Sequence, residues 1–231
     1  DDDESLLHVA MRQNAAEVVT AFVDMGLSPA LTPLDQMHAA ASINDVDGVQ
    51  AFVEAGVDIN GLSGSWIKQH TALGWAVLGD AVDVVRWLLA QPGIDVNAGD
   101  ESPLVTAVLR GRVEVVRLLL ADARTRTSER GSPVLHAVSR SPDNVAGEMV
   151  DVILHSGRAN VNEQDPGGWT ALHHAAFNGA GSMIRALLRQ PGIDLTIEDT
   201  RMGYTAYNVA MTSDRGGREF APLLGPRLGR T

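Results

Sequence analysis

A short apolar motif that opens a helical stretch occurs seven times along this chain, and it constrains the fold more than any other feature. From residue 7 to residue 207 the copies follow one another at an average spacing of about 33 residues. A unit of this length cannot bury its own apolar face and must pack on its neighbours. The period therefore predicts one elongated stack. The third residues of the seven motifs are Leu7, Met37, Leu73, Leu104, Val134, Leu172 and Tyr207.

The copy at residues 165–198 shows how one repeat is built. Residues 166–168, Pro-Gly-Gly, predict a turn, and Thr170 is an N-cap residue for a first short helix. Asn178-Gly179 predicts the end of that helix. Met183, Ile184, Leu187 and Leu188 then repeat with the period of a second amphipathic helix. Each repeat is therefore expected to be a turn followed by two antiparallel helices.

This pattern resembles the ankyrin repeat, in which a β-turn finger, a short helix, a longer return helix and a loop follow one another. The resemblance covers residues 5–224 and implies an all-α repeat solenoid, a single domain over residues 1–231. The expected repeats are residues 1–29, 30–60, 66–97, 98–128, 129–162, 165–198 and 199–224, followed by a tail at 225–231.

Some repeats depart from the common pattern. Residues 141–147 of the fifth repeat are expected to be an insertion between its two helices. The first repeat lacks a finger of its own, and the second helix of the seventh is degraded, as expected of terminal units. Leu118, in the fourth repeat, is expected in the core, whereas Leu224 lies near a frayed end and should matter much less.

Composition excludes several classes of function. The formal net charge is −11, which disfavours a nucleic-acid surface because such surfaces depend on Lys and Arg. The apolar runs are too short to span a bilayer, so no membrane association is expected. The chain has no Cys and opens with four acidic residues instead of a leader. A cytoplasmic or nuclear location is therefore the expectation.

No local motif for catalysis or metal binding is present. The sequence contains no His-x-x-x-His pair, phosphate-binding loop or nucleophile elbow, so no catalytic residue, metal or cofactor is assigned. The resemblance implies that His8, His38 and His173 form hydrogen bonds between repeats. His136 and His174 each lie one position later in the first helix of their own repeats, where a packing role is expected.

In ankyrin repeats, finger residues and the last residues of the first helix line a concave groove. The corresponding positions predict binding residues in this chain: Lys68, His70, Glu101, Arg110, Arg140, Trp169, Phe177, Asn178 and Tyr204, with Pro166 and Thr212 in the same row. Arg110 and Arg140 hold equivalent places in successive repeats and should project side by side. Arg beside aromatic side chains is the composition of a binding hot spot.

Three hypotheses of function are considered. The first, which the resemblance implies, is a non-catalytic, monomeric module that holds a partner protein or peptide, and this partner could carry acidic groups. The second is a small-molecule binder or unconventional enzyme, such as a cyclase or isomerase, in which Arg110 and Arg140 hold an anionic or carbonyl group. His70, Glu101 or Tyr204 would then be the acid–base candidates. The third is a purely structural spacer within a larger protein.

Overall fold

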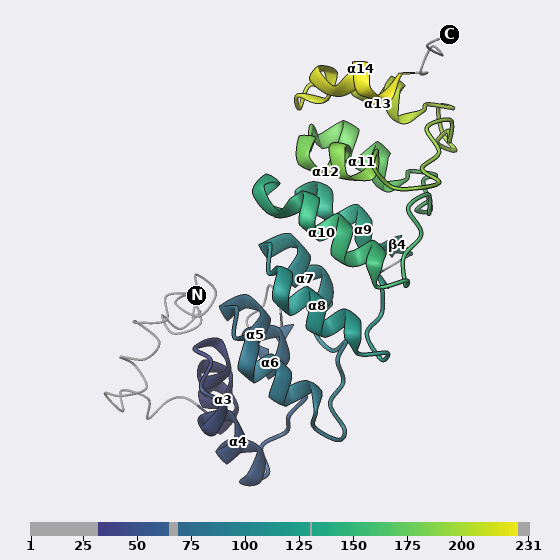
Figure 1. Ribbon diagram of the computed structural model, residues 1–231. Coiled ribbons are helices and arrows are strands. Elements are labelled where there is room, and N and C mark those ends of the chain that lie inside the picture. Colours follow the sequence, from purple (N-terminus) through teal and green to yellow (C-terminus); the bar gives the residue numbers. More distant parts are fainter. Residues whose placement is uncertain (1–31, 65–68, 130, 226–231) are drawn as a thin grey trace, which may run out of the picture. The chain divides into compact units, whose positions relative to one another are not determined.

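Figure 1 shows the computed structural model of the chain, which describes residues 32–64, 69–129 and 131–225. The predicted first repeat at 1–29 and the predicted site residue Lys68 lie outside the described residues. The chain divides into two compact units. The first comprises Asp1–Ala107 and Ala121–Thr125, and the second comprises Val108–Leu120 and Arg126–Thr231.

The first unit is built from short paired helices and one hairpin finger. Helix α3 packs against both α4 and α5, and α4 and α5 each pack against α6. The finger strands β1 and β2 pair in antiparallel register, Ser63 opposite His70. The elements are α3 (Pro33–Ser42), α4 (Val46–Glu54), β1 (Ser63–Gly64), β2 (Gln69–His70), α5 (Ala72–Gly79) and α6 (Val82–Leu89). Helices α7 (Pro103–Arg110) and α8 (Val113–Ala121) are each divided between the two units.

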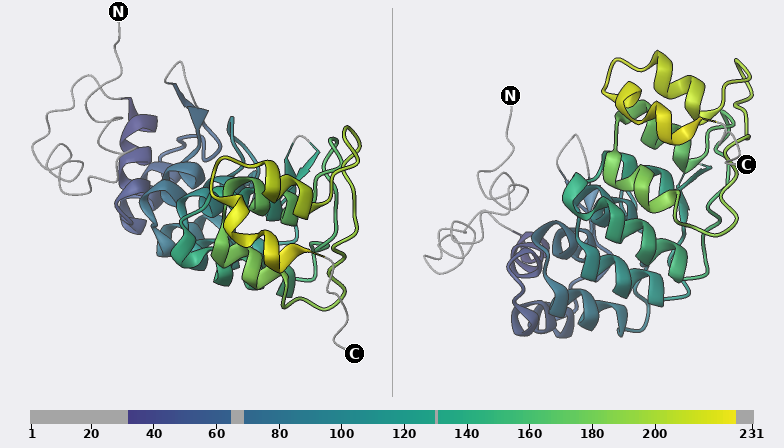
Figure 2. Two further views of the ribbon diagram at one scale, coloured as in Figure 1. Left: turned by 90° about the horizontal axis from the view of Figure 1, so that it is seen from above. Right: turned by 45° about the horizontal axis from the view of Figure 1, so that its top comes forward.

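The second unit continues the same arrangement. First helices pack on first helices, α9 on α11 and α11 on α13, while the second helices α10 and α12 pack on each other. The loops that precede α9, α11 and α13 lie on one side of these helices (Figures 1 and 2). Its elements are β3 (Ser128–Glu129), β4 (Ser132–Pro133), α9 (Val134–Ala137), η1 (Val138–Arg140), α10 (Asp143–His155), α11 (Ala171–Asn178), α12 (Gly181–Leu187), α13 (Ala206–Thr212), η2 (Gly217–Phe220) and α14 (Ala221–Leu224).

The first helices begin and end where the sequence predicts. Thr170 is the N-cap of α11, and Thr71 and Thr205 cap α5 and α13 in the same way. Helix α11 ends at Gly179, whose φ is 66°. A Cβ atom there would lie 2.5 Å from the carbonyl oxygen of Arg215, so both the backbone conformation and the close approach require glycine. Together these features confirm the expected all-α repeat architecture.

Asn side chains join the loops of successive repeats. The Nδ2 of Asn60 donates to the carbonyl oxygen of Gly93 at 2.8 Å, and its Oδ1 accepts from the Asp95 amide at 2.8 Å. Within the second unit, Asn162 makes the same pair of bonds to Gly192 and Asp194. Because each amide satisfies one backbone acceptor and one backbone donor, it fixes the distance between adjacent loops.

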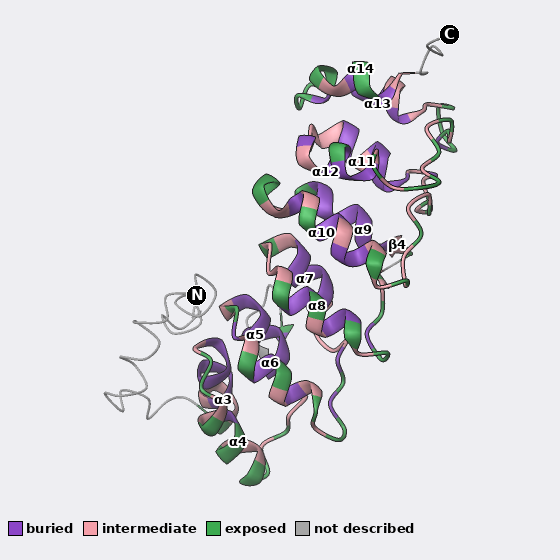
Figure 3. Cartoon of the chain, viewed as in Figure 1, coloured by how far each residue is buried: buried purple, intermediate pink, exposed green. Residues whose placement is uncertain are grey.

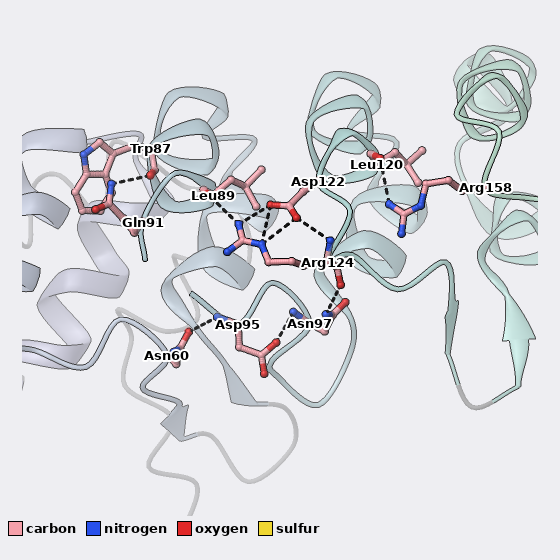
Figure 4. A network of polar contacts seen from close by, with 10 residues as sticks. All are labelled: Asn60, Trp87, Leu89, Gln91, Asp95, Asn97, Leu120, Asp122, Arg124 and Arg158. Carbon is pink, nitrogen blue, oxygen red and sulfur yellow. Dashed lines mark hydrogen bonds and ion pairs between the residues drawn. The ribbon is translucent and has the colours of Figure 1, made fainter. Parts of the chain in front are cut away.

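Arg124 reinforces this linkage in the first unit. Its guanidinium forms an ion pair with Asp122 and donates to the carbonyl oxygen of Leu89 at 2.7 Å, and its own carbonyl accepts from Asn97 (Figure 4). In the second unit, Arg158 donates to the carbonyl oxygen of Leu120 at 3.2 Å in the same manner. These Arg side chains therefore satisfy carbonyl groups at helix ends, which is a structural role.

The expected insertion at residues 141–147 is wrong in one respect. Most of this segment is helical, since α10 begins at Asp143. Pro142 precedes the helix, and the Asp143 carboxylate accepts from both the amide and the hydroxyl of Ser182 at the start of α12, at 3.0 and 2.8 Å. The extra residues therefore lengthen the second helix, because a proline and an acidic first turn start it early.

The expected contrast between Leu118 and Leu224 is also wrong. Leu118 is only partly buried and its neighbour Leu119 is fully buried, while Leu224 is 2% exposed. The error has a simple cause. Periodicity alone leaves the helix face uncertain by one position, and the degraded last repeat still forms η2 and α14, which pack on α13.

Core burial in the second unit can be tested with a matched pair of leucines. Helix α11 is mostly buried (Figure 3). Its residue Leu172 is 1% exposed, whereas Leu223 in α14 is 45% exposed. Leu172→Ala is expected to lower the free energy of unfolding by about 2–5 kcal/mol because it leaves a cavity. Leu223→Ala should change it by less than about 0.5 kcal/mol. Equal losses in urea titrations would contradict this packing.

Candidate functional site

Aromatic rings gather on the finger side of the second unit around Trp169. Its indole lies edge-on to Phe177, with ring centroids 5.5 Å apart, and edge-on to His174 at 5.1 Å. It also stacks on His173 at 6.2 Å. Trp169 ends the finger that precedes α11, and the other three residues belong to α11 itself. The finger and its own helix therefore form one aromatic cluster.

A pocket of about 560 Å³ adjoins this cluster. Its walls come from the three successive fingers that precede α9, α11 and α13 and from α11 and α13 themselves, and they are mostly apolar. Met202, in the finger that precedes α13, is 66% exposed at the edge of the pocket. The pocket is lined by Ser132, Asp165, Pro166, Gly167, Trp169, Phe177, Asp199, Arg201, Met202, Tyr204, Val209 and Thr212.

Two carboxylates in the pocket wall are held by their own turns. The Oδ1 of Asp165 accepts from the amides of Gly167 and Trp169, at 2.8 and 3.0 Å. Burial alone would raise the pKa of Asp165, but the bonds from His174 and from these amides outweigh it and lower the pKa. The Met202 amide similarly lowers the pKa of Asp199. Both groups are therefore ionised at neutral pH.

His173 links two successive repeats. Its Nδ1 accepts from the amide of Thr170 at 3.2 Å, and its Nε2 lies 3.0 Å from the carbonyl oxygen of Tyr204 in the next finger. Since a carbonyl can only accept, Nε2 carries the proton. The hydrogen bond between repeats that was expected at this position is confirmed for His173.

His136 and His174 differ from His173 in their partners. The Nε2 of His136 lies 3.0 Å from the carbonyl oxygen of Glu163, and its Nδ1 is buried and has no hydrogen-bond partner among the described residues. The Nε2 of His174 lies 2.9 Å from Oδ2 of Asp165. The two imidazole rings are 4.9 Å apart, centroid to centroid. Beyond packing, these residues therefore carry a polar arrangement that the sequence did not predict.

The structure brings part of the predicted site together. Trp169, Phe177 and Tyr204 all line the pocket described above, as do Pro166 and Thr212. Asn178 closes α11 and donates through Nδ2 to the hydroxyl of Ser139 at 3.0 Å. That these residues bind a ligand stays a prediction.

The other predicted residues are placed differently. His70 and Glu101 belong to the first unit. His70 is 8% exposed, with its ring edge-on to Trp75 at 5.3 Å, so it offers little surface to a ligand. Arg110 and Arg140 end α7 and η1 in the second unit, and both are exposed. Whether the two guanidinium groups project side by side stays a prediction.

Sequence reasoning missed Asp165, Asp199 and Met202. The two Asp residues occupy equivalent places at the start of successive fingers, so the repeat register was a signal that could have found them. Met202 had no such signal, because finger tips vary in length and are exposed. Its position became known only with the fold.

A family model described as ankyrin repeats, in three copies, matches residues 36–129, 105–199 and 135–225. Palmitoyltransferase AKR1 of Eremothecium gossypii is 33% identical over 173 residues, which cover 72% of this chain and 23% of that protein. Rabankyrin-5 of Mus musculus is 42% identical over 65 residues, covering 28% of this chain and 5% of that protein. The chain thus spans about a quarter or less of the length of these relatives.

Solved structures with a similar fold include an ankyrin repeat domain from Acinetobacter baumannii AYE, with a TM-score of 0.63 and 26% identity, covering 81% of this chain and 95% of that one. A chain of the solved complex between the predatory endopeptidase Bd0816 of Bdellovibrio bacteriovorus and the immunity protein Bd3460 gives a TM-score of 0.64 at 22% identity, covering 82% of this chain and 96% of that one. Among the described residues of this chain, none of the helices has the length and apolar character needed to cross a membrane.

The buried His136 predicts a pH dependence of stability. Burial, and secondarily the neighbouring His174, lower the pKa of His136 to about 4, whereas the pKa of a His in the unfolded chain is about 6.5. Between these values the unfolded chain binds the extra proton, so stability falls as pH falls through this range. For this one group the loss from about pH 7.5 to about pH 5 should be about 2 kcal/mol.

Urea titrations at the two pH values, in the presence of a chelator, measure this loss. His136→Gln should lose less stability on acidification than the wild type, although His173, whose burial also lowers its pKa, leaves part of the dependence. An identical loss in both proteins would show that His136 is not buried in its neutral form.

Proposed function

The chain belongs to the ankyrin repeat family, and from this premise we propose that it binds a partner protein or peptide through the finger side of its second unit, acting as a monomer. Ankyrin repeats typically mediate interactions between proteins. One solved neighbour is a chain from the complex of a predatory endopeptidase with an immunity protein, a precedent for a chain of this fold within a protein complex. That this chain itself binds a protein partner is what we propose.

The pocket beside Trp169 is the observation that carries the proposal. It is about 560 Å³ in volume, mostly apolar, and lined by Trp169, Phe177 and Tyr204. Aromatic side chains supply large contact areas at low entropic cost, and partly exposed pockets of this kind accept a partner's anchor side chain. Met202 extends the apolar surface at the pocket's edge. Because Asp165 and Asp199 are held by their own turns, the anchor is proposed to be apolar.

Arg110 and Arg140 supply the proposed contact to acidic groups of the partner. Both are exposed, and neither forms an ion pair or hydrogen bond with another described side chain. This contrasts with Arg124 and Arg158, whose guanidinium groups are committed to backbone carbonyls. A free guanidinium can bind a carboxylate through two parallel hydrogen bonds. The contact should act at short range, because the protein as a whole repels anions.

A small-molecule ligand is the alternative. The pocket volume lies within the range of about 300–1,000 Å³ that is common for such ligands. Of the acid–base candidates of the enzymatic hypothesis, Tyr204 lines this pocket. Protein binding remains the function we propose, because the pocket is mostly apolar and lined by the aromatic side chains of Trp169 and Phe177.

Affinity for the partner should depend on the Trp169 anchor. Partners are captured from a native lysate with the wild-type chain, identified by mass spectrometry, and measured by calorimetry as purified proteins. Trp169→Ala should weaken binding by about 2 kcal/mol or more, because a hot-spot anchor is lost. Leu223→Ala, an exposed apolar residue outside the pocket, is the control and should bind as the wild type does. A Trp169→Ala variant that keeps full affinity would refute the pocket as the binding site.

Substituting Lys for Arg separates charge from hydrogen-bond geometry. Arg110→Lys with Arg140→Lys keeps the net charge but loses the planar fork, so affinity for the same partner should fall. Arg189→Lys is the matched control, since Arg189 is exposed and lies 3.8 Å from Asp151, away from the pocket wall. If the double variant and the control bind equally well, the acidic contact is wrong while the Trp169 pocket can still stand.

A further inference from the structure

Two histidines and one carboxylate converge beside the Trp169 pocket. His136 belongs to α9, His174 to α11, and Asp165 to the finger that precedes α11. One donor atom from each residue lies within 4.8 Å of the others. A tetrahedral ion with ligands at about 2.0–2.2 Å needs donors about 3.3 Å apart, a spacing that small side-chain rotations would reach from here.

His136 presents a nitrogen that the protein itself leaves without a partner. Its side chain is buried, with 4% of the residue exposed, and its Nδ1 has no hydrogen bond with any described residue. The bond between Nε2 and the carbonyl oxygen of Glu163, 3.0 Å long, requires the proton on Nε2. The lone pair is therefore on Nδ1. A buried polar atom without a partner is rare in proteins and asks for an explanation.

The surroundings of the three residues match the outer contacts of metal ligands. Ligating histidines typically donate their second ring nitrogen to a carbonyl or carboxylate, as His136 does to Glu163. The Asp165 carboxylate is oriented through Oδ1 by the amides of Gly167 and Trp169, which leaves Oδ2 towards His174 at 2.9 Å. Both His136 and Asp165 are thus held in place by bonds that do not use the donor atoms.

We propose that His136, Asp165 and His174 bind a divalent transition-metal ion, with Zn²⁺ as the best match. Two imidazole nitrogens and one carboxylate oxygen are donors that Zn²⁺ accepts, and three protein ligands leave one tetrahedral position open. Asp165 also lines the Trp169 pocket, so the open position is available to water or to a donor from a bound partner. The ion would replace the hydrogen bond between His174 and Asp165 and take up the lone pair of His136.

Calorimetry with ZnCl₂ on the full chain, stripped with a chelator and dialysed into a non-coordinating buffer, tests the site. The wild type should bind one ion per chain. His174→Ala, which removes a partly exposed ligand, and Asp165→Asn, which keeps the shape of the turn residue, should each lose this binding. His155→Ala is the control, because His155 is exposed and its Nδ1 contacts the carbonyl of Asp151 at 2.6 Å, outside the cluster.

Co²⁺ provides a second readout that does not depend on affinity alone. The wild type with Co²⁺ should show the visible absorption of a tetrahedral nitrogen–oxygen site, and His174→Ala should not. His136→Gln, checked for folding by circular dichroism, should abolish the same bands. The proposal is overturned if the wild type binds no ion, or if the His174→Ala and Asp165→Asn variants bind Zn²⁺ as the wild type does. Equal losses in His155→Ala and His174→Ala would also overturn it.

Discussion

The packing of first helices on one another is the contact on which the second unit depends. Helix α9 packs on α11, and α11 packs on α13, and each of the three helices buries small and apolar residues. This contact places equivalent residues of successive repeats side by side. It brings His136 to His174, Ser139 to Asn178, and His173 to the carbonyl of Tyr204. Both the pocket and the histidine cluster are consequences of this packing.

Polar contacts determine the spacing that the apolar contacts allow. Small residues such as Ala175 and Ala176 let helices approach closely, but apolar burial has no direction of its own. The Asn162 amide, which bonds to both Gly192 and Asp194, and the His173 imidazole do have direction. They connect loop to loop and helix to finger. His173 thereby holds the finger that carries Tyr204, one wall of the Trp169 pocket, against α11.

Much of the fold could be predicted from the sequence because its rules are local. Thr170, Asn178 and Gly179, which mark the beginning and end of α11, lie within a few positions of one another. The period of the sequence then predicts the same helix boundaries in the other repeats. The start of α10 and the burial of Leu118 were misjudged because competing local signals differ by one turn or one face. The lining by Trp169, Phe177 and Tyr204 followed from the register of the repeats.

The cluster of His136, Asp165 and His174 could not be found by motif, since metal motifs search for ligands a few residues apart. Here the two histidines come from successive repeats and meet only through helix packing. Recognising them requires comparing equivalent positions across repeats, and then knowing which nitrogen is left without a partner. That second fact depends on the carbonyl of Glu163, whose position only the folded chain determines.

Nuclear magnetic resonance of the histidine rings in the metal-free protein tests the stacking most directly. Our account predicts nuclear Overhauser contacts between the rings of His136 and His174, whose centroids lie 4.9 Å apart. It also predicts that the neutral rings of His136 and His173 carry their protons on Nε2. Absence of the inter-ring contacts, or protons on Nδ1 in both rings, would contradict the helix packing described above.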